Sequence, residues 1–173
     1  MNRRWFGWLL GIAVISALLA SILRPHQKFS PDVLSILKGC DRLTLYSLDP
    51  EKRANDTATD TITFHKFANL GQTEIVGNKA KSELIAALQR GMDENSTQSM
   101  MCFNPRHGIR ATRGDESVDI LICFECLQME VFTGKSRFWY RTSGTPQTFL
   151  DSLLTDAKVK LAPKPGETAE TTK

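Results

Sequence analysis

The chain has 173 residues, of which 41% are hydrophobic and 24% charged, and its formal net charge is +3. This length suits one membrane segment and one domain of ordinary size, and the excess positive charge comes entirely from three arginines in residues 1–24. Residues 25–173 carry 19 basic and 19 acidic residues, so they lack the broad basic field that nucleic-acid binding requires. Composition therefore argues against a nucleic-acid partner.

An uncharged apolar stretch, WFGWLLGIAVISALLASIL, runs for 19 residues from Trp5 to Leu23. A helix needs about 20 such residues to cross a bilayer. Arg3 and Arg4 precede the stretch, and basic residues stay on the cytoplasmic side. The pattern predicts a single-pass membrane protein with a cytoplasmic N-terminus and an extracytoplasmic domain, in the periplasm or at the cell surface. A cleaved signal peptide is the alternative, although its apolar core is usually only ~7–15 residues long.

Composition divides the chain into four parts. Residues 1–24 are expected to be a transmembrane signal anchor, which makes the membrane a partner, and residues 25–39 a tether. Residues 40–161 hold the apolar periodic segments and are expected to form the extracytoplasmic domain. Residues 162–173, APKPGETAETTK, contain no apolar residue larger than alanine and are expected to be a disordered tail. No feature identifies a protein partner.

The first half of the domain combines strand patterns with one clear helix. A short helix or lead-in is expected at 32–38, a strand at 42–48, a mobile polar loop at 49–61 and a second strand at 62–70. Apolar residues at helical spacing predict a helix over 78–92. We expect Asn78 to cap the start of this helix and Gly91 to close its end.

The second half is a series of short strands followed by a helix. Turn residues separate consecutive apolar runs, which favours a meander of antiparallel hairpins, and Thr145-Pro146 starts a helix with Thr145 as its cap. The strands are expected at 99–103, 108–112, 117–124, 128–132 and 137–141. The order predicts an α+β fold: an antiparallel sheet with two helices packed on one face, preceded by the transmembrane helix.

Cys102, His107, Cys123 and Cys126 have the spacing C-x4-H-x15-C-x2-C, which suits a four-coordinate zinc site. The local context argues against zinc. Cys123 and Cys126 lie in the run ILICFECLQ, no glycine or proline follows before Phe132, and residues three apart in a regular strand face opposite sides. A bulge in the strand would restore the ligand geometry. Zinc is thus one candidate cofactor, and no other cofactor is indicated.

Export favours disulfides, because bridges persist in oxidising compartments. A bridge from Cys102 to Cys123 or Cys126 would join neighbouring strands, and Cys40 would take the remaining cysteine. Thiol–disulfide redox chemistry is a third interpretation, but an acidic residue between the paired cysteines does not favour a thiolate. We expect bridges or buried thiols that brace the sheet, with the other two interpretations open.

Two arginines beside His107 form a possible anion-binding pair. Arg106 and Arg110 lie four residues apart and share a face if the segment is a strand, and guanidinium groups suit phosphate or carboxylate. The alternative is a solvated surface on which arginines pair with nearby acids such as Asp119. The second interpretation is favoured.

The run CFNPRHGIRAT, followed by VDILICFEC, resembles an uncharacterised family of small exported bacterial proteins. That family shares Cys-Phe-x-Pro-Arg-His-Gly and, about 15 residues on, Ile-Cys-Phe-x-Cys, and the resemblance covers roughly residues 40–160. It implies no activity. No hydrolase motif or phosphate-binding glycine loop is present either. A structural or binding role without enzymatic activity is therefore expected.

Overall fold

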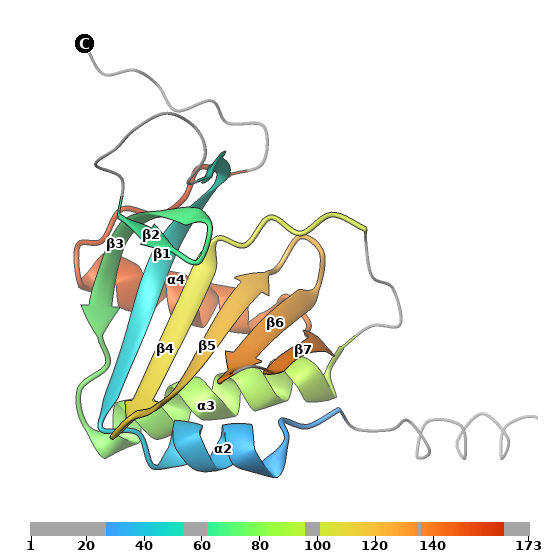
Figure 1. The fold of residues 1–173 in the computed structure, drawn as a ribbon. Helices are drawn as coiled ribbons and strands as arrows, with labels where there is room; N and C mark the ends of the chain where they lie inside the picture. The colour runs from blue at the N-terminus through green and yellow to red at the C-terminus, as the bar shows by residue number, and fades with distance from the viewer. Residues whose placement is uncertain (1–26, 54–61, 96–100, 135, 165–173) are drawn as a thin grey trace, which may run out of the picture.

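The computed structural model describes residues 27–53, 62–95, 101–134 and 136–164. In these residues seven strands form one curled antiparallel sheet, and helices cover one of its faces (Figure 1). The sheet order is β2-β3-β1-β4-β5-β6-β7. The α+β prediction and its antiparallel sheet are confirmed. The strands are β1 (Arg42–Arg53), β2 (Thr63–Phe64), β3 (Phe67–Glu74), β4 (His107–Arg113), β5 (Glu116–Cys123), β6 (Gln128–Thr133) and β7 (Ser136–Arg141).

The four strands from β4 to β7 form the predicted meander, since each pairs with the next through a short turn. The strand expected at 42–48 is confirmed within β1, but three other predictions differ from the structure. β1 continues to Arg53, through residues expected in a loop. The segment 62–70 is a hairpin, because His65 adopts a positive φ of 53° and reverses the chain between β2 and β3. The described residues 101–103 form no strand.

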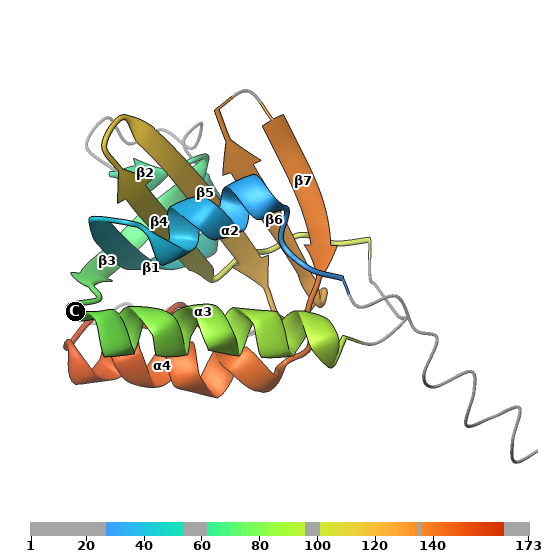
Figure 2. The same cartoon turned by 90° about the horizontal axis from the view of Figure 1, so that it is seen from below.

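Three helices occur in the described residues: α2 (Pro31–Lys38), α3 (Asn78–Asp93) and α4 (Thr145–Asp156). Helix α2 is the short helix or lead-in expected at 32–38, so three helices are present where two were expected to pack on the sheet. Helix α2 starts where the Ser30 hydroxyl accepts a hydrogen bond from the Val33 N–H, with Pro31 in the first turn. Figure 2 shows α3 and α4 side by side and α2 lying against the strands. Buried residues of all three helices belong to one core cluster with the sheet, so the helices cover the same face.

The predicted helix caps differ from the observed ones. Gly77 and Gly144 occupy the N-cap positions of α3 and α4, and neither helix has a side-chain cap. Gly91 lies inside α3, where an added Cβ would stand 2.5 Å from the Thr142 hydroxyl and 2.6 Å from Cγ of Pro146. The glycine therefore permits a close approach of the chain entering α4.

Apolar side chains gather on both faces of the sheet. The large core lies between the sheet and the helices, and its strand residues include Leu45, Ile109, Ile120 and Ile122. A smaller cluster on the opposite face contains Tyr46, Leu48, Phe64, Phe67 and Leu121. Alternation along β5 sends Ile120 and Ile122 to one face and Leu121 to the other.

The side chain of Gln27 binds the backbone of the edge strand β7. Its carbonyl oxygen accepts the Arg141 N–H at 2.7 Å, and its amide nitrogen donates to the Trp139 carbonyl at 3.5 Å. The described N-terminal end of the chain is thereby attached to one edge of the sheet.

In the described parts of the chain, no helix is long and apolar enough to cross a membrane. The expected anchor at residues 1–24 lies outside those parts.

Candidate functional site

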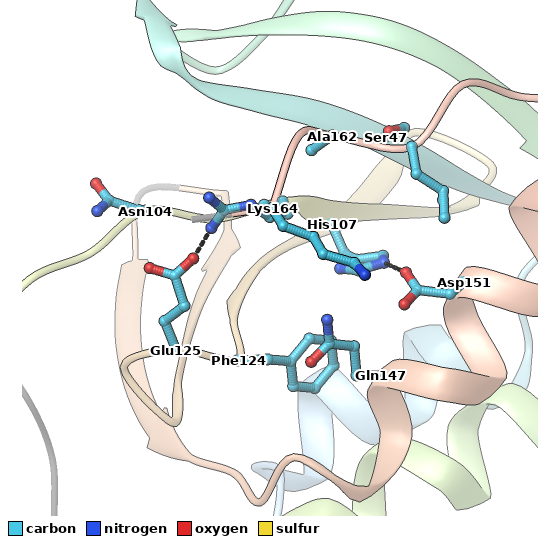
Figure 3. A pocket seen from close by; sticks show the side chains of 11 residues that line it. Ser47, Asn104, His107, Phe124, Glu125, Gln147, Asp151, Ala162 and Lys164 are labelled. Atoms are coloured by element: carbon cyan, nitrogen blue, oxygen red, sulfur yellow. Dashed lines mark hydrogen bonds and ion pairs between the residues drawn. The ribbon is translucent and has the colours of Figure 1, made fainter. Parts of the chain in front are cut away.

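A cavity of about 520 Å³ opens at one end of the sheet (Figure 3). It lies where β4 begins, β5 ends, and α4 meets the chain that follows it. The cavity is lined by Ser47, Asn104, Arg106, His107, Phe124, Glu125, Gln147, Asp151, Leu161, Ala162 and Lys164. Residues 162–164, expected in a disordered tail, thus form part of its wall, whereas 165–173 lie outside the described chain.

His107 is the buried polar centre of this pocket. As the first residue of β4 it stands opposite Ser47 in β1 and Ile122 in β5. The imidazole is 3% exposed, and its Nε2 lies 2.8 Å from an Asp151 carboxylate oxygen. Phe124 meets the ring edge-on, with centroids 5.3 Å apart. An ionised carboxylate only accepts hydrogen bonds, so the tautomer with its proton on Nε2 fits this contact, and in that tautomer Nδ1 offers a lone pair.

Two buried polar atoms of the pocket have no partner. In the described part of the chain, neither Nδ1 of His107 nor the hydroxyl of Ser47 makes a hydrogen bond. Leaving such an atom unpaired costs about 1–3 kcal/mol. Ser47 is fully buried and directly opposite His107 across the sheet, so both groups face the same side. Both residues line the pocket, so a molecule bound there would supply the missing hydrogen bonds.

The charged groups at the mouth of the pocket already have partners. Arg106 forms an ion pair with Glu125, and its Nε donates to the Pro163 carbonyl at 2.8 Å. Burial lowers the pKa of Arg106, while the charges of Glu51 and Asp49 act in the opposite direction. The guanidinium thereby joins the start of β4 to the β5–β6 turn and to the chain after α4.

Three of the four cysteines meet at the turn between β5 and β6. Residues 124–127 form this turn, and Leu127 closes it with a positive φ of 54°. Cys123 and Cys126 form a disulfide, and the sulfur of Cys102 lies 2.9 Å from that of Cys126. Cys126 therefore lies in a turn and not in the regular strand assumed when its geometry with Cys123 was considered. A bridge from Cys102 to Cys123 or Cys126 stays a prediction. Cys40 is a separate buried thiol whose pKa is raised by burial, an effect that Lys81 opposes.

The residues proposed for zinc lie in two separate places. His107 stands opposite Ile122, whose side chain is in the large core, so alternation places Cys123 on the other face of β5. His107 is bound to Asp151, and Cys123 to Cys126. Across the four described ranges, no group of three or more His, Cys, Asp or Glu side chains is arranged to hold a metal ion. Zinc binding stays a prediction.

The two candidate anion-binding arginines also have separate surroundings. Arg110 lies away from the pocket and binds both oxygens of Asp119, at 2.7 and 2.6 Å, while Nε2 of His65 lies 3.0 Å from the same carboxylate. The hydrogen bond with Asp119 raises the pKa of Arg110. Since each arginine is paired with a carboxylate, the structure does not bring Arg106 and Arg110 together as a clamp for one anion.

Sequence reasoning identified His107 and Arg106 but missed most of the pocket. Ser47 carried a detectable signal, because alternation along 42–48 placed it on the same face as Leu43 and Leu45. Asp151 and Gln147 lie four apart on α4 and therefore share a face, but nothing in the chain order shows which strand that face meets.

Comparison with known proteins adds no relative: no family model, no curated protein and no solved structure matches this chain. The resemblance to exported bacterial proteins therefore stays a prediction.

Proposed function

We propose that this chain is a membrane-anchored extracytoplasmic domain that binds a small, neutral, hydroxyl- or amide-rich molecule in the His107 pocket. The proposed membrane anchor and the extracytoplasmic location rest on the uncharged segment Trp5–Leu23, which follows Arg3 and Arg4. The binding role follows from the pocket.

The observation that carries the proposal is the pair of unsatisfied buried atoms, Nδ1 of His107 and the Ser47 hydroxyl. A protein interior rarely leaves two neighbouring polar groups unpaired, because each costs free energy. A ligand hydroxyl or amide would donate to Nδ1 and exchange a further hydrogen bond with Ser47. The cavity volume of about 520 Å³ lies within the usual range for small-molecule sites.

The remaining lining groups define the class of ligand. The Arg106–Glu125 ion pair compensates its own two charges, and the Asp151 carboxylate is hydrogen-bonded to His107, so these groups already have partners within the pocket, which disfavours a charged ligand. Gln147 also lines the pocket, and its side-chain amide can both donate and accept hydrogen bonds. An aromatic wall beside several such groups suits a ring that carries hydroxyl or amide substituents, and a monosaccharide is the simplest example.

Binding is tested by titrating the full chain with three probes, glucose, N-acetylglucosamine and glycerol, while recording protein NMR shifts. At least one ring sugar should shift the signals of His107 and Gln147. In Ser47→Ala its affinity should fall about 5–30-fold, because one hydrogen bond is lost. The free energy of unfolding without ligand should stay unchanged or rise, because the substitution removes an unpaired buried hydroxyl.

Ser117→Ala serves as the matched control, since this serine is exposed on β5 and remote from the pocket lining. It should change neither affinity nor stability. The binding proposal fails if no probe shifts the pocket signals, or if Ser47→Ala lowers stability while leaving sugar affinity intact.

The proposed location of the domain outside the cytoplasm is tested independently by two reporters fused after Lys173 in a bacterial host. Alkaline phosphatase should be active, because it folds only where disulfides form, and a green fluorescent protein exported by the same route should stay dark. Replacing Arg3 and Arg4 by glutamate should reduce the phosphatase signal, because the basic flank sets the orientation. A bright fluorescent fusion with inactive phosphatase would place the domain in the cytoplasm.

A further inference from the structure

The sulfurs of Cys102, Cys123 and Cys126 form a contiguous group at the β5–β6 turn. Cys126 is the central member: it is bonded to Cys123, and its sulfur lies 2.9 Å from that of Cys102. Cys123 and Cys126 are fully buried, whereas Cys102 is exposed. A free thiol therefore lies in contact with one sulfur of a disulfide, and the exposed member is the thiol.

This arrangement supplies what thiol–disulfide exchange requires. Exchange proceeds when a thiolate attacks one sulfur of a disulfide and displaces the other as a thiolate. Here Cys102 is the attacking group, Cys126 the attacked one and Cys123 the leaving group. The backbone N–H of Cys126 donates to the Cys123 sulfur at 3.2 Å, and such a hydrogen bond stabilises the negative charge that develops there.

We propose that these three cysteines form an internal exchange centre that switches the disulfide between Cys123–Cys126 and Cys102–Cys126. Cys102 loses its proton to water and its thiolate forms a bond with the Cys126 sulfur. The Cys123–Cys126 bond breaks with its electron pair on Cys123, which takes up a proton from water. One thiol and one disulfide are present before and after the step, so no external oxidant or reductant is consumed.

The two disulfide isomers hold the pocket wall differently. With Cys123–Cys126 bonded, the segment leading into β4 is held to the turn by the Arg106–Glu125 ion pair. With Cys102–Cys126 bonded, the same segment is covalently joined to the turn. Phe124 and Glu125 lie between the paired cysteines and line the pocket, as does Asn104. Exchange would then alter the shape of the pocket, a regulatory consequence that rests on the proposed binding function.

The exchange is tested on the full chain by acid quenching, alkylation with N-ethylmaleimide, digestion and mass mapping. Wild-type protein should give two populations, one alkylated at Cys102 and one at Cys123. In Cys123→Ser, oxidation with glutathione disulfide should produce the Cys102–Cys126 bridge, and in Cys126→Ser neither bridge should form. Cys40→Ser is the control and should leave both populations unchanged, since Cys40 is buried apart from the group.

Two results would overturn the exchange centre. One is a wild-type protein in which Cys102 alone is alkylated, together with a Cys123→Ser variant that stays reduced at Cys102 and Cys126. The other is a protein with three free thiols and one bound zinc. The alkylation pattern of the wild-type protein tests the proposal even if a variant does not fold. Because mapping uses no ligand, its outcome is independent of whether the pocket binds a sugar.

Discussion

Replacing Ile120 by alanine should lower the free energy of unfolding by about 2–5 kcal/mol. Ile120 is fully buried in β5, between β4 and β6, and belongs to the core that the sheet shares with all three helices. The substitution removes apolar contacts and leaves a cavity that neighbouring β-sheet backbone cannot readily fill. Urea titration monitored by circular dichroism measures the change.

Ile62→Ala removes the same atoms at a position that is 74% exposed. This control should change stability by less than about 0.5 kcal/mol, because little apolar surface is buried there. A loss in Ile120→Ala as small as that of the control would mean that the helices do not pack on this face of the sheet.

The second large effect concerns Asp119, whose carboxylate is hydrogen-bonded to Arg110 and His65. Burial alone would raise the pKa of Asp119, but these hydrogen bonds outweigh it and hold the pKa below the ordinary value of 3.8. A pKa that is lower in the folded than in the unfolded state stabilises the fold at pH values above the unfolded-state pKa. This stabilisation is lost as the pH falls through the folded-state pKa. The free energy of unfolding should therefore decrease on acidification below about pH 4.

Asp119→Asn should remove that part of the acid dependence and cost about 1–3 kcal/mol at neutral pH, through the loss of charged hydrogen bonds. Urea titrations at a series of pH values measure both effects. Glu116→Gln is the control: this exposed carboxylate pairs with Arg113 near the end of the same strand and should contribute less than about 0.5 kcal/mol. If Asp119→Asn lost as much stability at low pH as the wild type does, the hydrogen-bonded Asp119 cluster would not be the cause of the acid sensitivity.

The fold class could be predicted from the sequence because local patterns and tertiary structure agree over most of the domain. The strands after residue 107 alternate and are separated by turn residues, so the meander required no long-range information. The hairpin at 62–70 was missed because its reversal depends on His65 at positive φ, a conformation usually marked by glycine or asparagine. The length of β1 was missed because its last residues, DPEKR, are polar and resemble a loop.

Only part of the candidate site could be predicted from the sequence. The cysteines and His107 attract notice as residue types, but the faces they occupy depend on a turn that no glycine or proline announces. Leu127 supplies the positive φ instead, and this single conformation changes which residues the cysteines meet. The contact between His107 and Asp151 joins residues 44 positions apart and depends on how α4 packs, which local periodicity does not determine.

The contact of Gln27 with β7 bears on whether this edge of the sheet can pair with another chain. An edge strand offers unpaired backbone groups to any other chain, and short edge strands or covered edges are two ways to prevent such pairing. At one edge β2 has only two residues, while at the other the Gln27 amide binds the Trp139 carbonyl and the Arg141 N–H as a neighbouring strand would. A proteolytic fragment that begins beyond Gln27 would expose this edge and become prone to intermolecular β-aggregation.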